Sequence, residues 1–283
     1  MAAILALMSA FAYGVSDFTG GLAARRVAAV SVVLLSNGLS LALALLAVWL
    51  VPGSRLVATD LAWGGAAGAV GVVGVVLLYR GLAIGPMSVV APLTAVLSAV
   101  VPVVVGTVRG DRPGDLAVAG MVLALPALVA VGRPVSRDGR PHVSGHALVA
   151  ALGAGVSFGG FYVLLAQTGP DGGAWPLVTQ RGASVVLLLA ALPVAAAVAH
   201  GPMVPRGSTI VLAAAAGVTD FAANLTYVLA THRGLLALVA VISSLYPATT
   251  VLLARGVLHE RLSRDQGAGL LLAAVSVTLI ALR

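Results

Sequence analysis

The chain has 283 residues, of which 60% are hydrophobic and 9% are charged, and its net charge of +7 rests on arginine because lysine is absent. A soluble domain usually carries about 25% charged residues, so this composition excludes an ordinary soluble domain and indicates a protein embedded in a lipid bilayer. The absence of lysine and cysteine also excludes a Gly-Lys-Ser/Thr phosphate-binding loop, a lysine Schiff base and thiolate chemistry.

A helix needs about 20 predominantly apolar residues to cross a bilayer, and the sequence contains ten such stretches separated by short polar gaps. The arginines are dispersed between these stretches, as residues at a membrane surface are, so we expect no nucleic-acid partner. The sequence therefore predicts an all-α integral membrane protein with ten transmembrane helices, over residues 2–22, 28–51, 61–79, 87–108, 116–132, 145–166, 175–199, 209–230, 235–256 and 266–282.

Short matches along the chain indicate an internal repeat. Residues 14–16 (GVS) recur as 155–157, 141 positions later, and residues 66–68 (AAG) recur as 215–217, 149 positions later. Chance matching in a sequence rich in Ala, Gly and Val is the alternative. The duplication predicts a first five-helix repeat over 1–132, a polar linker over 133–144 and a second five-helix repeat over 145–283. Because five is odd, the second repeat enters the membrane from the opposite face, which predicts two inverted repeats around a central cavity.

Polar side chains within the spans are candidates for the cavity lining, because an ionisable group in the hydrocarbon core costs at least about 2.5–3.5 kcal/mol. The clearest set is in the eighth span, where Asp220, Asn224 and Tyr227 lie at i, i+4 and i+7 on one face of a helix. Asp220 is about halfway along the span, so it must face a partner or a wet cavity. The alternative is a polar clamp between neighbouring helices.

Four other spans contribute further candidates. Tyr13 and Asp17 lie one turn apart in the first span, Arg80 follows the third, and Arg181 stands inside the seventh. Asp17 and Arg80 are also close enough to span ends to be hydrated at the membrane surface, which is the alternative for both. We expect no metal site, and the predicted substrate-binding residues are Tyr13, Ser16, Asp17, Tyr79, Arg80, Gln180, Arg181, Asp220, Asn224, Tyr227 and Tyr246.

Several short motifs resemble those of a known family. They are YGVS at 13–16, YRGLAIGP at 79–86 followed by APL at 91–93, GDRP at 110–113 and HERL at 259–262. With the order of the spans, they resemble the drug/metabolite transporter superfamily in its ten-helix EamA-type branch. Asp111 stands where that family usually has Glu, and His259 replaces the Gly of the second copy. Neither departure identifies a substrate.

The resemblance implies a secondary active transporter that exports small organic metabolites such as amino acids or amphiphilic drugs by alternating access. Such a protein needs a small-molecule substrate and a lipid bilayer but no cofactor, and a monomer is sufficient, although the oligomeric state is open. Protonation of Asp220 or Asp17 is a candidate route for coupling export to a proton gradient. The alternatives are a passive facilitator or channel and a membrane-embedded transferase. We expect no enzyme, because the nine acidic residues are scattered.

Orientation is a point on which two arguments disagree. Ten spans place both termini on one side of the membrane. Ten arginines follow the odd-numbered spans and six lie on the other side, which favours external termini by the positive-inside rule. The family resemblance implies cytoplasmic termini in the cell membrane, and we favour this arrangement because three of the ten arginines lie in the central linker.

Overall fold

The computed structural model describes residues 1–50, 54–84, 87–131, 145–198, 202–258 and 264–282, and all regular secondary structure in these ranges is helical. The predicted linker over 133–144 lies outside the described residues. The helices are α1 (Ala2–Ala24), α2 (Ala29–Leu50), α3 (Ala58–Ile84), α4 (Met87–Val108), α5 (Asp115–Val131), α6 (Gly145–Leu165), η1 (Pro170–Gly172), α7 (Trp175–Val198), α8 (Ser208–Thr231), α9 (Leu236–Ser243), α10 (Tyr246–Leu258) and α11 (Arg264–Ala281).

Seven helical segments of the described chain are long and apolar enough to cross a membrane. They are Ala2–Ala24, Ala29–Leu50, Ala58–Leu78, Gly145–Leu165, Trp175–Ala197, Ser208–Thr231 and Leu236–Val257. Shorter apolar helices cover Leu93–Val108 and Asp115–Ala130. This all-helical architecture, with large apolar side chains exposed along many helices, is that of a multi-pass membrane protein.

The predicted ninth span, 235–256, is two helices rather than one, because α9 ends at Ser243 and α10 begins at Tyr246. Pro247 has no backbone N–H, so it cannot continue the hydrogen-bond ladder of α9, and it lies in the first turn of α10, where that N–H would have no partner within the helix. At the junction, Ser244 N–H donates to the Ala240 carbonyl and Leu245 N–H donates to the Ile242 carbonyl. The break places the side chain of Tyr246 at the start of α10.

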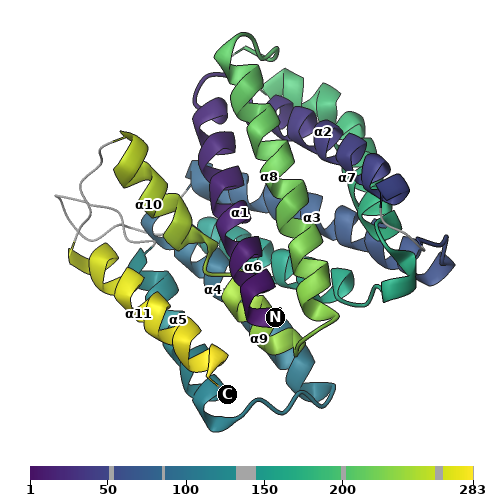
Figure 1. Cartoon of the computed structure of the whole chain (residues 1–283). Coiled ribbons are helices and arrows are strands. Elements are labelled where there is room, and N and C mark those ends of the chain that lie inside the picture. Colours follow the sequence, from purple (N-terminus) through teal and green to yellow (C-terminus); the bar gives the residue numbers. More distant parts are fainter. Residues whose placement is uncertain (51–53, 85–86, 132–144, 199–201, 259–263, 283) are drawn as a thin grey trace.

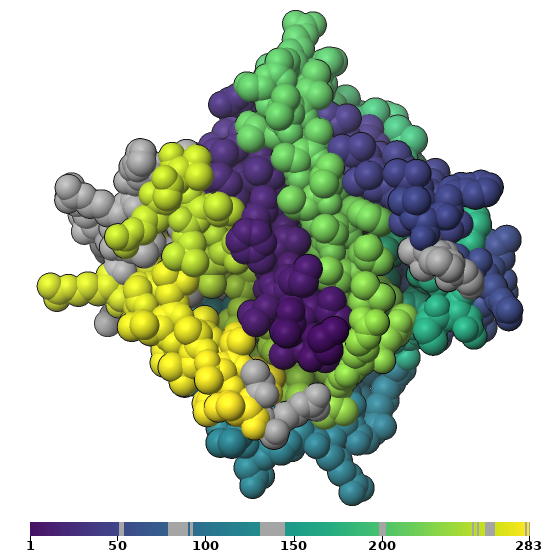
Figure 2. All heavy atoms as spheres, in the orientation of Figure 1, coloured from purple at the N-terminus to yellow at the C-terminus, as the bar shows by residue number. Residues whose placement is uncertain are grey.

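The helices pack into two bundles, each of which draws on both predicted repeats. In the first bundle α1 packs against α8, α9 and α10, and α2 packs against α8. Figures 1 and 2 show α1 lying between α8 and α10 on one face of the molecule. In the second bundle α6 packs against α3 and α4, and α3 packs against α7. Contacts of α2 with α7 and of α4 with α9 join the bundles, and α5 packs along α11.

Close helix contacts within and between the bundles depend on small residues. A Cβ atom at Gly68 of α3 would collide with the Gln180 carbonyl of α7, and one at Gly14 of α1 would lie 2.7 Å from the Tyr246 carbonyl oxygen. Gly64 and Gly68 both lie against α7, so this face of α3 is a packing surface of small residues. The short helix α9 is buried along Ala237 to Ile242, among α1, α4 and α5.

Candidate functional site

A cavity of about 220 Å³ lies between the two bundles. The first bundle contributes Tyr13, Asp17, Val33, Asn37, Asp220 and Tyr246 to its lining. The lining residues of the second bundle are Gly71, Val72, Val75, Leu78, Ser98, Phe158, Phe161, Tyr162, Gln180, Arg181, Ser184 and Leu188. Because most of this lining is aromatic or aliphatic and the charged groups are few, the cavity has the composition of a small-molecule site.

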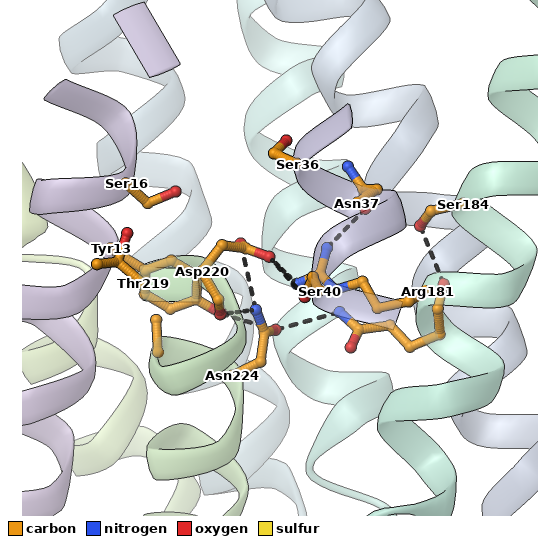
Figure 3. Close-up of polar contacts among 12 residues, drawn as sticks. Tyr13, Ser16, Ser36, Asn37, Ser40, Arg181, Ser184, Thr219, Asp220 and Asn224 are labelled. Carbon is orange, nitrogen blue, oxygen red and sulfur yellow. Dashed lines mark hydrogen bonds and ion pairs between the residues drawn. The ribbon is translucent and has the colours of Figure 1, made fainter. Parts of the chain in front are cut away.

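An ion pair crosses the cavity from one bundle to the other. Arg181 Nη2 of α7 lies 2.5 Å from Asp220 Oδ2 of α8, and Arg181 Nη1 donates to Asn37 Oδ1 of α2 over 2.8 Å (Figure 3). Arg181 is 7% exposed, so its charge is desolvated and depends on these two acceptors. Ser40 Oγ donates to the same Asp220 oxygen over 3.5 Å. The two oppositely charged predicted residues therefore meet, although they come from different helices.

Asn224 continues this network below the ion pair. Its Nδ2 donates to the backbone carbonyl of Asp220 over 2.7 Å and to Asp220 Oδ1 over 3.3 Å, as expected for residues one helical turn apart. Its Oδ1 accepts hydrogen bonds from Tyr13 Oη over 2.9 Å and from Gln180 Nε2 over 3.1 Å. Asn224 is 1% exposed and does not line the cavity, so it links α1, α7 and α8 beneath it.

Tyr227, the third residue of the predicted α8 face, is fully buried and lies outside the cavity lining. Its hydroxyl donates to the Tyr162 carbonyl over 3.1 Å, and the two ring centroids are 4.8 Å apart. Along one helix face, the predicted stripe thus runs from the cavity at Asp220, through the network at Asn224, into the core at Tyr227.

Asp17 and Tyr246 line the cavity from the first bundle, on α1 and α10. Asp17 is exposed and has no hydrogen bond or ion pair among the described residues. The ring of Tyr246 lies 6.2 Å from that of Tyr13, centroid to centroid. Ser16 points away from this wall, because its hydroxyl donates to the Ala216 carbonyl of α8 over 3.0 Å. Of the three predicted residues in α1, Tyr13 and Asp17 face the cavity and Ser16 fastens α1 to α8.

Comparisons with known proteins bear on this arrangement. Residues 145–282 match the EamA-like transporter family. The chain carries an EamA-like transporter domain. A protein of known crystal structure with 18% sequence identity has the same fold, with a TM-score of 0.76 over 99% of this chain and 96% of that one. The comparison with curated proteins found no match. The match confirms the resemblance seen in the motifs and indicates a membrane transporter of small molecules.

Two of the predicted binding residues cannot be placed by their side chains. Tyr79 and Arg80 are within α3, which continues to Ile84, but their side chains lie outside the described part of the structure. Arg80 therefore occupies the last turns of a helix and not, as the predicted span 61–79 implies, the residue after its end.

Several residues in or beside the cavity lining were not predicted from the sequence. Asn37 and Ser40 were detectable, because they are polar residues three positions apart in a predominantly apolar span. Phe158, Phe161 and Tyr162 carry no such signal, since aromatic side chains in a span face lipid as readily as a cavity. Their position in the lining depends on the packing of α6 against α3 and α4.

The described contacts between the bundles extend from the cavity toward the end of the molecule where α1 begins (Figure 1). The ring of His232, which follows α8, lies 2.6 Å from the Thr168 carbonyl oxygen beyond α6, measured from Nε2. Because a carbonyl oxygen only accepts, Nε2 carries the proton in this contact. Asp111 Oδ2, beyond α4, accepts a hydrogen bond from the Ala237 N–H at the start of α9 over 3.0 Å. These contacts join the bundles below the cavity.

The described residues contain no group of three or more His, Cys, Asp or Glu side chains that could hold a metal ion. The charged and polar groups that line the cavity include a guanidinium, two carboxylates, amides and tyrosine rings.

Proposed function

We propose that the protein is a secondary active transporter that exports small organic metabolites, such as amino acids or amphiphilic drugs, across the cell membrane. The observation that carries this proposal is the cavity between the bundles, with the Arg181–Asp220 pair crossing it. A binding site whose two walls belong to different packing units can open on either side when those units tilt against each other. The match to the EamA-like transporter family supports transport as the function of this cavity.

The packing of the helices supports two inverted five-helix repeats and ten spans. The contact of α1 with α8 has its counterpart in the contact of α6 with α3, which exchanges the first and third helices of the predicted repeats. The contact of α2 with α8 corresponds likewise to that of α7 with α3, and α5 packs against its counterpart α11. Pairs that exchange in this way are expected for two halves related by a two-fold axis in the membrane plane.

Alternating access is proposed to move the two bundles and not the two sequence repeats. Each bundle contains helices from 1–132 and from 145–283, so tilting whole repeats would separate α1 from α8 and α3 from α6. The bundles meet along fewer helices, through the packing of α2 on α7 and of α4 on α9. The ion pair, the Gln180–Asn224 hydrogen bond and the contacts around Thr168 and Asp111 add polar links. Separating the bundles therefore exposes less packed helix surface than separating the repeats would.

Proton coupling is proposed at Asp220 and Asp17, the two carboxylates of the cavity. Protonation of Asp220 removes the charge that Arg181 contacts across the cavity, and so weakens a link between the bundles. Transport in proteoliposomes under an imposed pH gradient tests this role. Asp220→Asn is expected to abolish accumulation driven by the gradient while leaving exchange across the membrane. Full gradient-driven transport by this variant would contradict coupling through Asp220.

The same assay separates a transporter from a passive facilitator. A coupled transporter accumulates its substrate against a concentration gradient, whereas a facilitator only equilibrates it.

The termini are proposed to lie in the cytoplasm. A reporter that is active only in the cytoplasm, fused after Arg283, is expected to be active. A reporter active only outside the cell is expected to be inactive at the same position, and the opposite pair of results would show that the arginine count gives the true orientation.

A further inference from the structure

The cavity contains two acceptor groups that nothing in the described structure satisfies. The Asp17 carboxylate is exposed in the lining and has neither a hydrogen bond nor an ion pair. Gln180 Oε1 is buried without a hydrogen-bond partner, on a residue that is 0% exposed. Buried polar groups are normally paired, so an orphan acceptor in a cavity lining indicates a ligand or water that donates to it.

The orientation of the Gln180 amide follows from its neighbours. The Nδ2 atom of Asn224 must face Asp220, because both Asp220 contacts are acceptors. Asn224 Oδ1 is thereby turned toward Tyr13 and Gln180, and of the two polar atoms of the Gln180 amide only Nε2 can donate to it. Gln180 Oε1 is consequently the free end of the amide.

The charges of the lining favour a cation. Asp17, Asp220 and Arg181 are its charged residues within the described chain, so their sum is negative by one. Arg181 already contacts Asp220 and Asn37, so an anionic group would have to displace a carboxylate from its guanidinium. Asp17 has no such competitor.

Aromatic rings enclose the apolar part of the site. Tyr13 and Tyr246 of the first bundle meet Tyr162 of the second, with the Tyr13 ring 6.2 Å from Tyr246 and 6.1 Å from Tyr162 between centroids. Phe158 and Phe161 contribute to the lining from α6. The close approach at Gly14 brings the first turn of α10 against α1, which places Tyr246 beside the helix that carries Asp17. Aromatic faces attract both aromatic groups and cations.

We propose that this cavity takes small arylalkyl ammonium ions. The ammonium group pairs with Asp17, the aryl group packs among the tyrosine and phenylalanine rings, and a donor at the far end of the ligand reaches Gln180 Oε1. The proposal names the substrate class of the transporter proposed above and rests on that function for its role. Anions are excluded from this class. Amino-acid zwitterions are expected to bind more weakly than ammonium ions, because the carboxylate of a zwitterion finds no free cation in the described lining.

Equilibrium binding to the purified full chain in detergent tests the site with four probes of similar shape. Tyramine is the cation, 4-ethylphenol the neutral probe, 3-(4-hydroxyphenyl)propionate the anion and tyrosine the zwitterion. We expect tyramine to bind about tenfold more tightly than each of the others. Tighter binding of the propionate or of tyrosine would overturn the proposal.

Matched variants locate the interaction. Asp17→Asn is expected to weaken tyramine about tenfold and to leave 4-ethylphenol unchanged, which also shows that the variant is folded. Asp115→Asn makes the same change at an exposed residue of α5 outside the lining and is expected to leave both affinities unchanged. Tyr246→Phe keeps the aromatic ring and is expected to bind tyramine as the wild type does. Tyr246→Leu removes the ring and is expected to lower tyramine affinity about tenfold. Equal tyramine binding by the wild type and Asp17→Asn would show that Asp17 is not the ammonium partner.

Proteoliposome transport separates this proposal from the one on which it rests. If tyramine binds through Asp17 but is never accumulated under a gradient, the ammonium site stands and the active transporter does not. If tyrosine is accumulated at the same rate by the wild type and by Asp17→Asn, the transporter stands and the ammonium site is wrong.

Discussion

The pair formed by Arg181 and Asp220 shows how single residues define the cavity. Removing one member of a partly buried pair leaves the other charge without its partner, whereas replacing both leaves no unpaired charge. The pair therefore determines how the helices are arranged more than it adds to the stability of the fold. Asp220 keeps 23% of its side chain exposed, so part of its charge is hydrated. Its further contacts with Ser40 and Asn224 come from the neighbouring helix α2 and from its own helix α8.

Arg181→Gln is expected to lower the free energy of unfolding by about 1–3 kcal/mol, because Asp220 then faces Asn37 and Ser40 without a cation. The double variant Arg181→Gln with Asp220→Asn is expected to recover at least half of that loss, since no charge is left unpaired. Thermal unfolding of the purified variants in one detergent measures both. A double variant no more stable than Arg181→Gln alone would show that the pair is not coupled.

The helical periodicity of the sequence correctly predicted which residues share one face of a helix. It could not predict which residues of other helices face them. The spacing of Asp220 and Asn224 correctly places them on one face, and the structure joins them by a hydrogen bond. Nothing in the sequence indicates that Arg181 lies opposite Asp220, because 39 positions and a change of helix separate them. Tyr227 shares the same face but lies in the core, since the depth of a residue depends on the neighbouring helices.

At the scale of helices, the apolar runs predicted most boundaries to within a few residues, because the length of an apolar run is a property of the sequence alone. The break between α9 and α10 was not predicted. Residues 235–256 are predominantly apolar, and Ser243 and Ser244 are compatible with a continuous helix. Only Pro247 marked the site, and a proline within a membrane helix can also produce a kink.

The contact of α3 with α7 is expected to control the position of the ion pair. A methyl group at Gly68 would meet the backbone of Gln180, the residue before Arg181, so Gly68→Ala must displace α7. We expect a loss of about 1–3 kcal/mol in stability and a loss of substrate binding. Gly65→Ala is the control on the same helix, because nothing lies within 4 Å of its Cβ, and it is expected to be neutral or slightly stabilising. Equal effects of the two substitutions, measured by thermal unfolding and binding, would contradict this role of the contact.

The whole molecule is organised by the exchange of helices between the predicted repeats. Since α1 packs on α8 and α6 packs on α3, the cavity lies between bundles that each combine early and late parts of the chain. A division at the polar linker describes the order of the sequence, whereas the bundles describe which helices can move together. Such long-range packing could not be derived from the runs of apolar residues, because helices of similar composition are interchangeable in that pattern.

Crosslinking tests which units move. The chain has no cysteine, so introduced pairs are the only thiols. Thr168→Cys with His232→Cys joins the two bundles below the cavity, where His232 contacts the Thr168 carbonyl. Arg26→Cys with Ser208→Cys joins α1 to α8 within the first bundle, where Arg26 Nη1 donates to Ser208 Oγ over 2.6 Å. A thiol crosslinker is expected to stop transport at least about tenfold in the first pair and to leave the second active, because alternating access requires the bundles to separate below the cavity. If the second crosslink arrests transport and the first does not, α1 and α8 belong to different moving units, and the two predicted repeats are the bodies that move.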